Sequence, residues 1–153
     1  MTPISEVLSP ENVILNLAAH DKKEAIAESI TKLAFHPSVH DFAALQQAIE
    51  SRDAASISEN GVGICIAHGR TDSVSSLVLT AARSLEGLAT PEIADPVRLV
   101  FVAGIPSAFS AEYLRIVGVI ARVCRDKHHL DRLLSVKTAQ EFIDILSAGE
   151  LRL

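Results

Sequence analysis

Apolar residues recur at helical spacing in the first third of the chain. Within residues 25–34 they return every three to four positions, which predicts one face of an amphipathic helix. Asp21 and Glu24 precede this stretch with the spacing of a capping box, and Pro37 limits its far end. A second helix is predicted to begin at Asp41, because apolar positions again follow at helical spacing.

The helical period returns in the last third of the chain, after Pro106. Ser110 is the predicted N-cap of one helix there, and Thr138 with Glu141 forms a second capping box before a final helix. The stripe that we expect to be buried on the first of these helices consists of Leu114, Val117, Ile120, Ala121 and Cys124.

The middle of the chain has the pattern of β-strands. Residues 61–67 form a short, glycine-bounded apolar run that predicts a strand ending at His68, and residues 76–80 and 97–103 predict two more. The run at 97–103 is apolar enough to lie in the middle of a sheet. Helices, strands and helices again indicate an α/β domain with a central sheet, whose strand order the pattern leaves open.

Composition fits a single domain over residues 1–153, because 48% of residues are apolar and no linker rich in Gly, Ser or Pro interrupts the chain. The formal net charge is −5 and there is no basic block, which argues against nucleic acid as a partner. No apolar run reaches the ~20 residues that cross a bilayer, so we expect no membrane insertion.

Cysteine usage and the first residues predict a cytoplasmic location. Cys65 and Cys124 lie in apolar stretches without CxxC spacing, as expected of reduced core residues rather than of a disulfide or a zinc site. The first residues lack the basic and apolar regions of a signal peptide.

His68 is the first candidate for chemistry, since it follows an apolar strand and precedes Gly69. A neutral imidazole is a nucleophile near neutral pH, and Arg70, two residues on, offers a fixed positive charge for an anionic group. A histidine in such a place can also be a structural, hydrogen-bonded residue. Position alone leaves both interpretations open.

A longer motif surrounds this histidine. Residues 52–70, RDAASISENGVGICIAHGR, resemble the signature of the fructose–mannitol and nitrogen-regulatory enzyme IIA family of the phosphotransferase system. Arg52 and His68 keep the family's separation without a gap. The resemblance also covers residues 8–14, the first helix, residues 96–101, the turn at Pro106 and the final helices.

The resemblance implies a fold and an activity. The fold is a five-stranded mixed sheet with helices on both faces. His68 matches the histidine whose Nε2 accepts a phosphoryl group from the carrier protein HPr, which makes the chain a phosphohistidine phosphotransferase component. The group then passes to a cysteine of a IIB domain or stays as a regulatory mark on a protein that acts on a target. No metal or other cofactor is implied.

Donors are needed to balance the charge of the phosphoryl group in transit. Arg70, the Ser58 hydroxyl and the backbone N–H groups around Gly69 are the expected donors, with Tyr113 at the place of a second family histidine. The residues expected to hold the motif in shape are Arg52, Gly61 and Gly63.

Three departures from the family pattern are expected to cluster at the site. Ala67 replaces a proline, Glu59 and Asn60 replace a Gly-Ile pair, and Tyr113 replaces the second histidine. Tyrosine can donate a hydrogen bond but carries no positive charge near neutral pH. The alternative is therefore a IIA-like regulatory binding module with weak or no transfer, and the absence of fused IIB or IIC segments favours a regulatory role. The sugar or target stays open.

Overall fold

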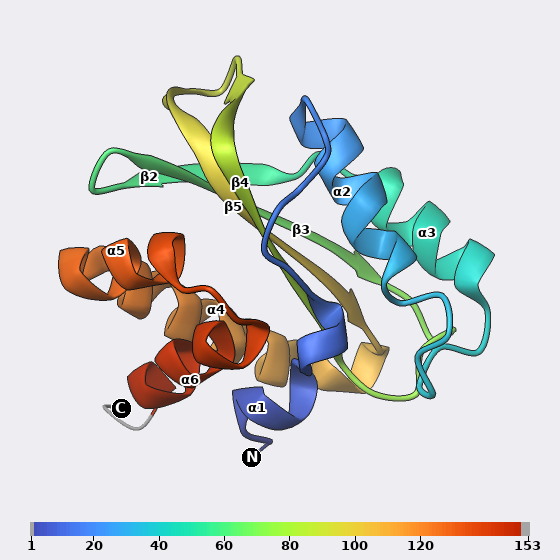
Figure 1. Cartoon of the computed structure of the whole chain (residues 1–153). Coiled ribbons are helices and arrows are strands. Elements are labelled where there is room, and N and C mark those ends of the chain that lie inside the picture. The colour runs from blue at the N-terminus through green and yellow to red at the C-terminus, as the bar shows by residue number, and fades with distance from the viewer. Residues whose placement is uncertain (1, 151–153) are drawn as a thin grey trace.

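A five-stranded mixed sheet forms the centre of the protein in the computed structural model, which describes residues 2–150 (Figure 1). The strand order is β1-β4-β5-β3-β2, with β1·β4 and β3·β5 parallel and the other two pairs antiparallel. The predicted α/β fold class is confirmed. The strands are β1 (Val13–Ile14), β2 (Ala55–Glu59), β3 (Val62–Arg70), β4 (Val78–Thr90) and β5 (Ile93–Ile105).

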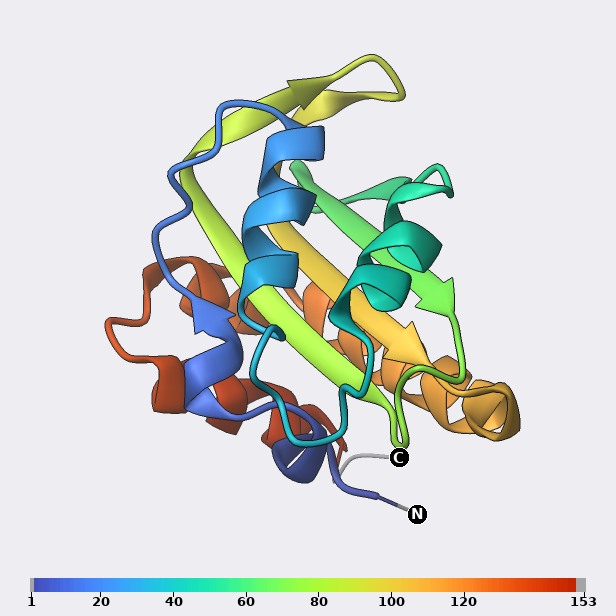
Figure 2. The same ribbon diagram turned by 90° about the vertical axis from the view of Figure 1, so that its right-hand side faces the viewer.

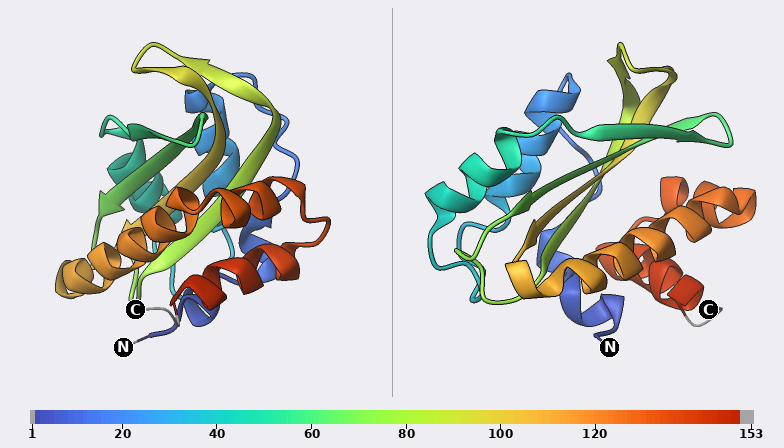
Figure 3. Two further views of the ribbon diagram at one scale, coloured as in Figure 1. Left: turned by 90° about the vertical axis from the view of Figure 1, so that its left-hand side faces the viewer. Right: turned by 180° about the vertical axis from the view of Figure 1, so that it is seen from behind.

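Helices cover both faces of the sheet. Figure 2 shows α2 (Lys22–Thr31) and α3 (Phe42–Glu50) side by side on one face. Figure 3 shows α4, α5 and α6 on the opposite face, and the short helix α1 belongs to the same layer. None of the helices within residues 2–150 is long and apolar enough to cross a membrane. The elements of this second layer are α1 (Ile4–Val7), α4 (Ser110–Arg125), α5 (Lys127–Ser135) and α6 (Ala139–Glu150), with 3-10 turns at Pro10–Asn12 and Ser107–Phe109.

Three of the predicted helix starts are confirmed by their caps. At the start of α6, the Thr138 hydroxyl accepts the Glu141 N–H at 3.1 Å. The Asp21 carboxylate accepts the Glu24 N–H at 2.8 Å, and the Glu24 carboxylate accepts the His20 N–H at 2.8 Å. Asp41 caps α3 by accepting the Ala44 N–H at 3.1 Å. These side chains satisfy N–H groups that have no partner inside the helix.

The start of α4 differs from the prediction. A 3-10 turn precedes the helix, so Ser110 is its first residue and makes no cap hydrogen bond. The predicted stripe was right for Ile120 and Cys124, which are buried, and wrong for Leu114, which is 67% exposed. The face that α4 buries against the sheet consists of Ile116, Val119, Ile120, Val123 and Cys124.

Burial on both sides explains why the central strands are almost continuously apolar. Along β5, alternate residues enter different cores: Phe101 faces α4–α6, whereas Val100 and Val102 face α2 and α3. The same alternation on β3 sends Ile64 to the first core and Cys65 to the second. Along each of these two strands, successive side chains therefore face opposite layers of helices. This alternation decides which layer each β3 side chain near His68 faces.

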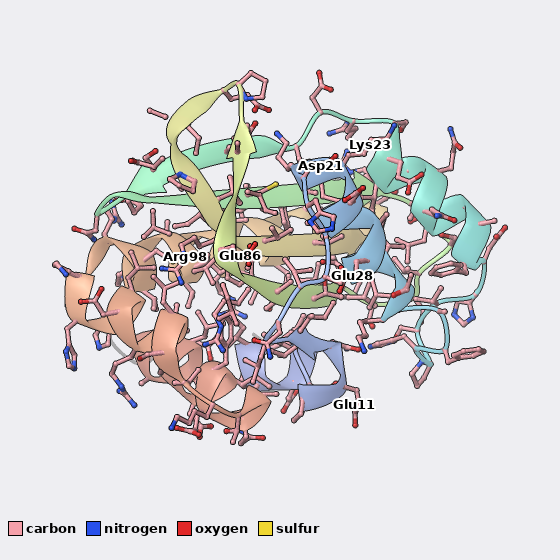
Figure 4. All side chains as sticks on the ribbon, turned by 45° about the horizontal axis from the view of Figure 1, so that its top comes forward. Glu11, Asp21, Lys23, Glu28, Glu86 and Arg98 are labelled. Atoms are coloured by element: carbon pink, nitrogen blue, oxygen red, sulfur yellow. The ribbon has the colours of Figure 1, made fainter. Side chains whose placement is uncertain are left out.

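Sequence patterning understated the length of β4 and β5, which twist together into a ribbon that extends past the helices (Figure 1). Arg83 pairs with Leu99 and Leu88 with Val97, so four residues of β4 bulge opposite Arg98. The Arg98 guanidinium donates to the carbonyls of Ser84 and Leu85, which the bulge removes from the ladder. Figure 4 shows Arg98 and Glu86 on this ribbon.

A two-residue turn joins β2 to β3. Asn60 and Gly61 have φ values of 51° and 79°, the left-handed pair that a tight hairpin of this type requires. The Asn60 side chain donates to the carbonyls of Cys124 and Arg125, both at 3.1 Å, and so caps the end of α4. The polar edge strand β2 was missed because it has few apolar residues to form a pattern.

Arg83 is 5% exposed and connects three segments through its guanidinium. It donates to the carbonyl of Leu15 at 3.1 Å, to that of Leu133 at 3.0 Å and to that of Val136 at 2.9 Å. The last two belong to the end of α5. One arginine thus holds a helix end and the segment after β1 against the sheet.

We expect Arg83→Leu to lower the free energy of unfolding by about 2–4 kcal/mol, because buried carbonyls lose their donors. Urea denaturation followed by circular dichroism measures this change. Arg98→Leu is the matched control, since its contacts are longer and one is exposed, and its loss should stay below about 1 kcal/mol. Equal losses in the two variants would contradict the role given to Arg83.

Candidate active site

The parallel pairing of β3 with β5 brings two chain segments to the same edge of the sheet. His68 pairs with Ala103 and Arg70 with Ile105, so both strands end together. After Ile105 the chain turns at Pro106 and enters α4. The first turn of α4 therefore lies beside the end of β3.

His68 lies within β3, which continues to Arg70 rather than ending at the histidine as predicted. By strand alternation its side chain faces the α4 layer, as that of Ile64 does. The ring of Tyr113 on α4 lies against it, with centroids 5.0 Å apart and planes inclined by 35°. The structure thus brings His68 and Tyr113 together, as the resemblance implied.

Arg52 contacts the imidazole directly. Arg52 lies in the segment between α3 and β2, before β2 begins to pair with the edge of β3. Its Nη1 is 3.2 Å from His68 Nε2. A guanidinium can only donate, so Nε2 is the acceptor and the ring proton of the neutral imidazole resides on Nδ1. Nε2 therefore holds its lone pair toward Arg52.

The surroundings keep His68 neutral. Burial lowers the pKa of His68, and the positive charges of Arg52 and Arg70 lower it further. Burial raises the pKa of Tyr113, so its phenol stays protonated. At neutral pH the site holds an uncharged nucleophile, a neutral hydroxyl donor and two permanent cations.

Arg70 follows His68 on the same face of β3 and reaches α4. Its Nη2 donates to the Ser110 hydroxyl, and Asp72 accepts the Ser107 N–H at 2.9 Å and the Ser107 hydroxyl at 3.1 Å. These bonds to Ser107 lower the pKa of Asp72. A cleft of about 300 Å³ remains between the elements. It is lined by Arg52, His68, Arg70, Ile105, Ser110, Tyr113 and Leu114.

Gly69 points the other way, into the layer of α2 and α3. A Cβ on this residue would lie 2.6 Å from the Ala48 carbonyl carbon and from the Ile49 nitrogen of α3. Only glycine permits this close approach of helix and strand. The contact sets the position of α3 and thereby of Arg52, which follows that helix.

Ser58 is the predicted site residue that the structure places elsewhere. It pairs with Gly63, five positions before His68 on β3, which corresponds to about 16 Å along the strand. The expectation that its hydroxyl assists at His68 was therefore wrong. Gly63 marks a register irregularity between β3 and β5, and Gly61 forms the hairpin turn, so both act on the scaffold.

Two of the departures from the family pattern also lie away from the imidazole. Glu59 pairs with Val62, six positions before His68, about 20 Å along the strand. Ala67 is 2% exposed and packs in the core under α2 and α3, on the opposite face of β3. Of these positions only Tyr113 touches the His68 ring.

Two contacts were missed by reasoning from the sequence. Arg52 was expected only to hold the motif in shape, although its fixed separation from His68 was a usable signal. Ser110 was expected to cap a helix, and no local signal connected it with Arg70, 40 residues earlier. Among residues 2–150, no cluster of three or more His, Cys, Asp or Glu side chains could hold a metal ion.

Residues 6–149 match the family model described as phosphoenolpyruvate-dependent sugar phosphotransferase system, EIIA 2. The fructose-specific EIIA component of Haloferax volcanii is 30% identical over 149 residues, which is 96% of this chain and 96% of that protein. The fructose-specific EIIABC component of Bacillus subtilis is 26% identical over 94% of this chain, which spans 23% of that longer protein. The chain belongs to the EIIA 2 family.

Solved structures share the fold. The nitrogen regulatory protein IIA-Ntr of Neisseria meningitidis superposes with a TM-score of 0.81 at 23% identity, over 94% of this chain and 98% of that one. The complex of Escherichia coli enzyme IIA mannitol with phosphorylated enzyme IIB mannitol gives 0.73 at 21% identity, over 92% and 96%. At these identities the likeness establishes the architecture.

We expect Arg52→Gln to raise the pKa of His68 toward its ordinary value of 6.5, because one of the cations that lower it is removed. Titration of the His68 Cε1 proton by NMR measures the change. Arg125→Gln, at the far end of α4, is the control and should leave the pKa unchanged. An unchanged pKa in Arg52→Gln would mean that Arg52 does not influence the imidazole.

The lowered pKa also predicts a pH dependence of stability. Because folded His68 binds a proton less readily than the unfolded chain does, its contribution is present above about pH 6.5 and is lost as the pH falls below it. His36, whose pKa burial also lowers, acts in the same direction. The free energy of unfolding of His68→Gln should therefore fall less between pH 7 and pH 5.5 than that of the wild type.

Proposed function

We propose that this chain is a phosphocarrier in which His68 accepts a phosphoryl group from phospho-HPr and passes it to an acceptor protein. The observation that carries the proposal is the neutral imidazole, whose Nε2 faces a cleft between two guanidinium groups. The nucleophile and the charges that an anionic group needs are in place before any donor arrives. Carriage between HPr and its acceptor places the chain in the cytoplasm.

Transfer begins when the hydrogen bond from Arg52 to the Nε2 lone pair breaks. Nε2 then attacks the phosphorus in line, a new N–P bond forms, and the N–P bond to the HPr imidazole breaks with its electron pair returning to that ring. Arg52, freed from Nε2, can donate to the phosphoryl oxygens. Because the bond that breaks and the bond that forms both join phosphorus to an imidazole nitrogen, the step needs neither a nucleotide nor a metal.

Arg70, Tyr113 and the backbone around Gly69 complete the proposed stabilising groups. Tyr113 lies against the acceptor ring and, as a protonated phenol, offers one neutral hydrogen bond. Replacing a charge-assisted bond by a neutral one costs about 1–2 kcal/mol of transition-state stabilisation, or about tenfold in rate. Transfer is therefore slower here than a second imidazole would allow.

The onward acceptor is proposed to be a IIB domain or a regulated protein. Support for the first comes from the related mannitol protein, whose structure is a complex with phosphorylated IIB. Support for the second comes from the nitrogen regulatory protein that shares the fold. Both uses of the phosphoryl group require the same acceptor chemistry at His68.

We expect His68→Ala to abolish phosphorylation when the protein is incubated with phosphoenolpyruvate, enzyme I and HPr. The wild type should gain one acid-labile phosphate by intact mass. The thermal midpoint of the variant should stay within a few degrees, since the ring is only partly buried and fills little of the core. If the wild type gains no phosphate from a cognate HPr, the proposal fails and a module that acts by contact alone takes its place.

We expect Tyr113→His to raise the rate of transfer about tenfold, because an imidazole that takes up a proton beside the phosphoryl anion restores a charged donor there. Rapid-quench measurement of labelled phosphate arriving at His68 tests this. Tyr113→Phe is the matched control and should lower the rate, since it keeps the ring and loses the hydroxyl. No gain in Tyr113→His would show that the phenol is already adapted to this site.

A further inference from the structure

We infer that the Ser110 hydroxyl is a further catalytic group, which donates a hydrogen bond to the phosphoryl group on His68 and is prepared for this by Arg70. The inference rests on the proposed function, because it names one more contact of the same group. Ser110 is the first residue of α4 and lines the cleft that holds His68.

The direction of the bond between Arg70 and Ser110 leaves the serine proton free. Arg70 Nη2 donates to Ser110 Oγ. A guanidinium has no acceptor atom, so the serine oxygen receives this bond and keeps its own O–H for another partner. Within residues 2–150, that O–H has no hydrogen-bond acceptor in the structure.

The position of Ser110 places its side chain in the lining of the cleft that also holds His68. Ser110 and Tyr113 are three residues apart on α4 and so lie on one face of the helix. Tyr113 lies against the His68 ring, and Ser110 borders the same cleft. Arg70 and His68 are two residues apart on β3, so their side chains face the same way and form the β3 side of the cleft.

The charge of Arg70 makes this hydroxyl a stronger donor than an isolated serine. Accepting a hydrogen bond from a cation polarises the O–H bond and strengthens the bond that it donates. The start of α4, a helix of 16 residues, adds the partial positive charge of its first N–H groups. Among residues 2–150, no carboxylate lines the cleft, and Asp72 at this edge of the sheet accepts the Ser107 N–H.

Arg70 therefore acts on the phosphoryl group through Ser110. The pair supplies a charge-assisted donor on the α4 side of the cleft, where Tyr113 provides only a neutral one. Arg52 supplies the cation on the opposite side, next to Nε2. The anion would be held between these groups.

The test compares Ser110→Ala with Ser110→Thr and with Ser107→Ala. Ser107→Ala is the matched control, since it removes a hydroxyl from the preceding turn that is bound to Asp72 outside the cleft. Each protein is phosphorylated both by phospho-HPr and by the small-molecule donor phosphoramidate, and the arrival of phosphate is followed by intact mass. The pH midpoint of the ³¹P chemical shift of phospho-His68 is a second readout.

We expect Ser110→Ala to slow phosphorylation about tenfold with both donors. The second pKa of the phosphoryl group should rise, because the dianion loses a donor. Ser110→Thr should keep most of the rate, and Ser107→Ala should change it less than about twofold. Arg70→Gln gives an independent variant with an exposed side chain, and it should slow transfer and raise the same pKa.

Two results would overturn the inference. One is an unchanged rate and an unchanged ³¹P midpoint in Ser110→Ala. The other is an equal loss of phosphorylation rate in Ser107→Ala, which would mean that Ser110 only holds α4 in place. If wild type reacts with phosphoramidate but not with phospho-HPr, the proposed function fails and the Ser110 comparison still stands. If wild type reacts with neither donor, both fail.

Discussion

The parallel pairing of β3 with β5 is the constraint on which the site depends. Parallel strands end at the same edge of the sheet, so the end of β3 meets the turn that follows β5. That turn delivers α4 and its first residues to the ring of His68. On the other face, the close contact of Gly69 with α3 sets the point from which Arg52 returns to the imidazole. Each layer of helices contributes one side of the cleft.

The charges around His68 have two opposed effects on the proposed transfer. Burial, Arg52 and Arg70 lower the pKa of His68 and so keep the imidazole neutral, yet Arg52 also occupies the lone pair that would attack the phosphorus. The same cations become favourable partners once an anion replaces that contact. Preorganised charge of this kind needs little rearrangement at the moment of reaction, which is how such sites stabilise a transition state.

Residues of the motif and beyond it serve the scaffold. Asn60 and Gly61 form the hairpin turn, and the Asn60 amide also caps α4, the helix that carries Tyr113. Outside the motif, Arg83 holds the end of α5 to the sheet. The departures at Glu59 and Ala67 therefore leave the imidazole untouched, and the chemical difference from the family pattern is concentrated in Tyr113.

The sequence alone determined the fold class, three capped helix starts and the choice of His68 as the candidate site residue, because these depend on local periodicity, on short-range caps and on a contiguous motif. It missed β2, the bulge opposite Arg98 and part of the buried face of α4, where burial is set by neighbours distant in sequence. Only the tertiary structure separated Ser58 from the site and brought Arg52 and Ser110 to it. Strand register and helix packing decide which side chains meet, and neither is encoded in the spacing of residues along the chain.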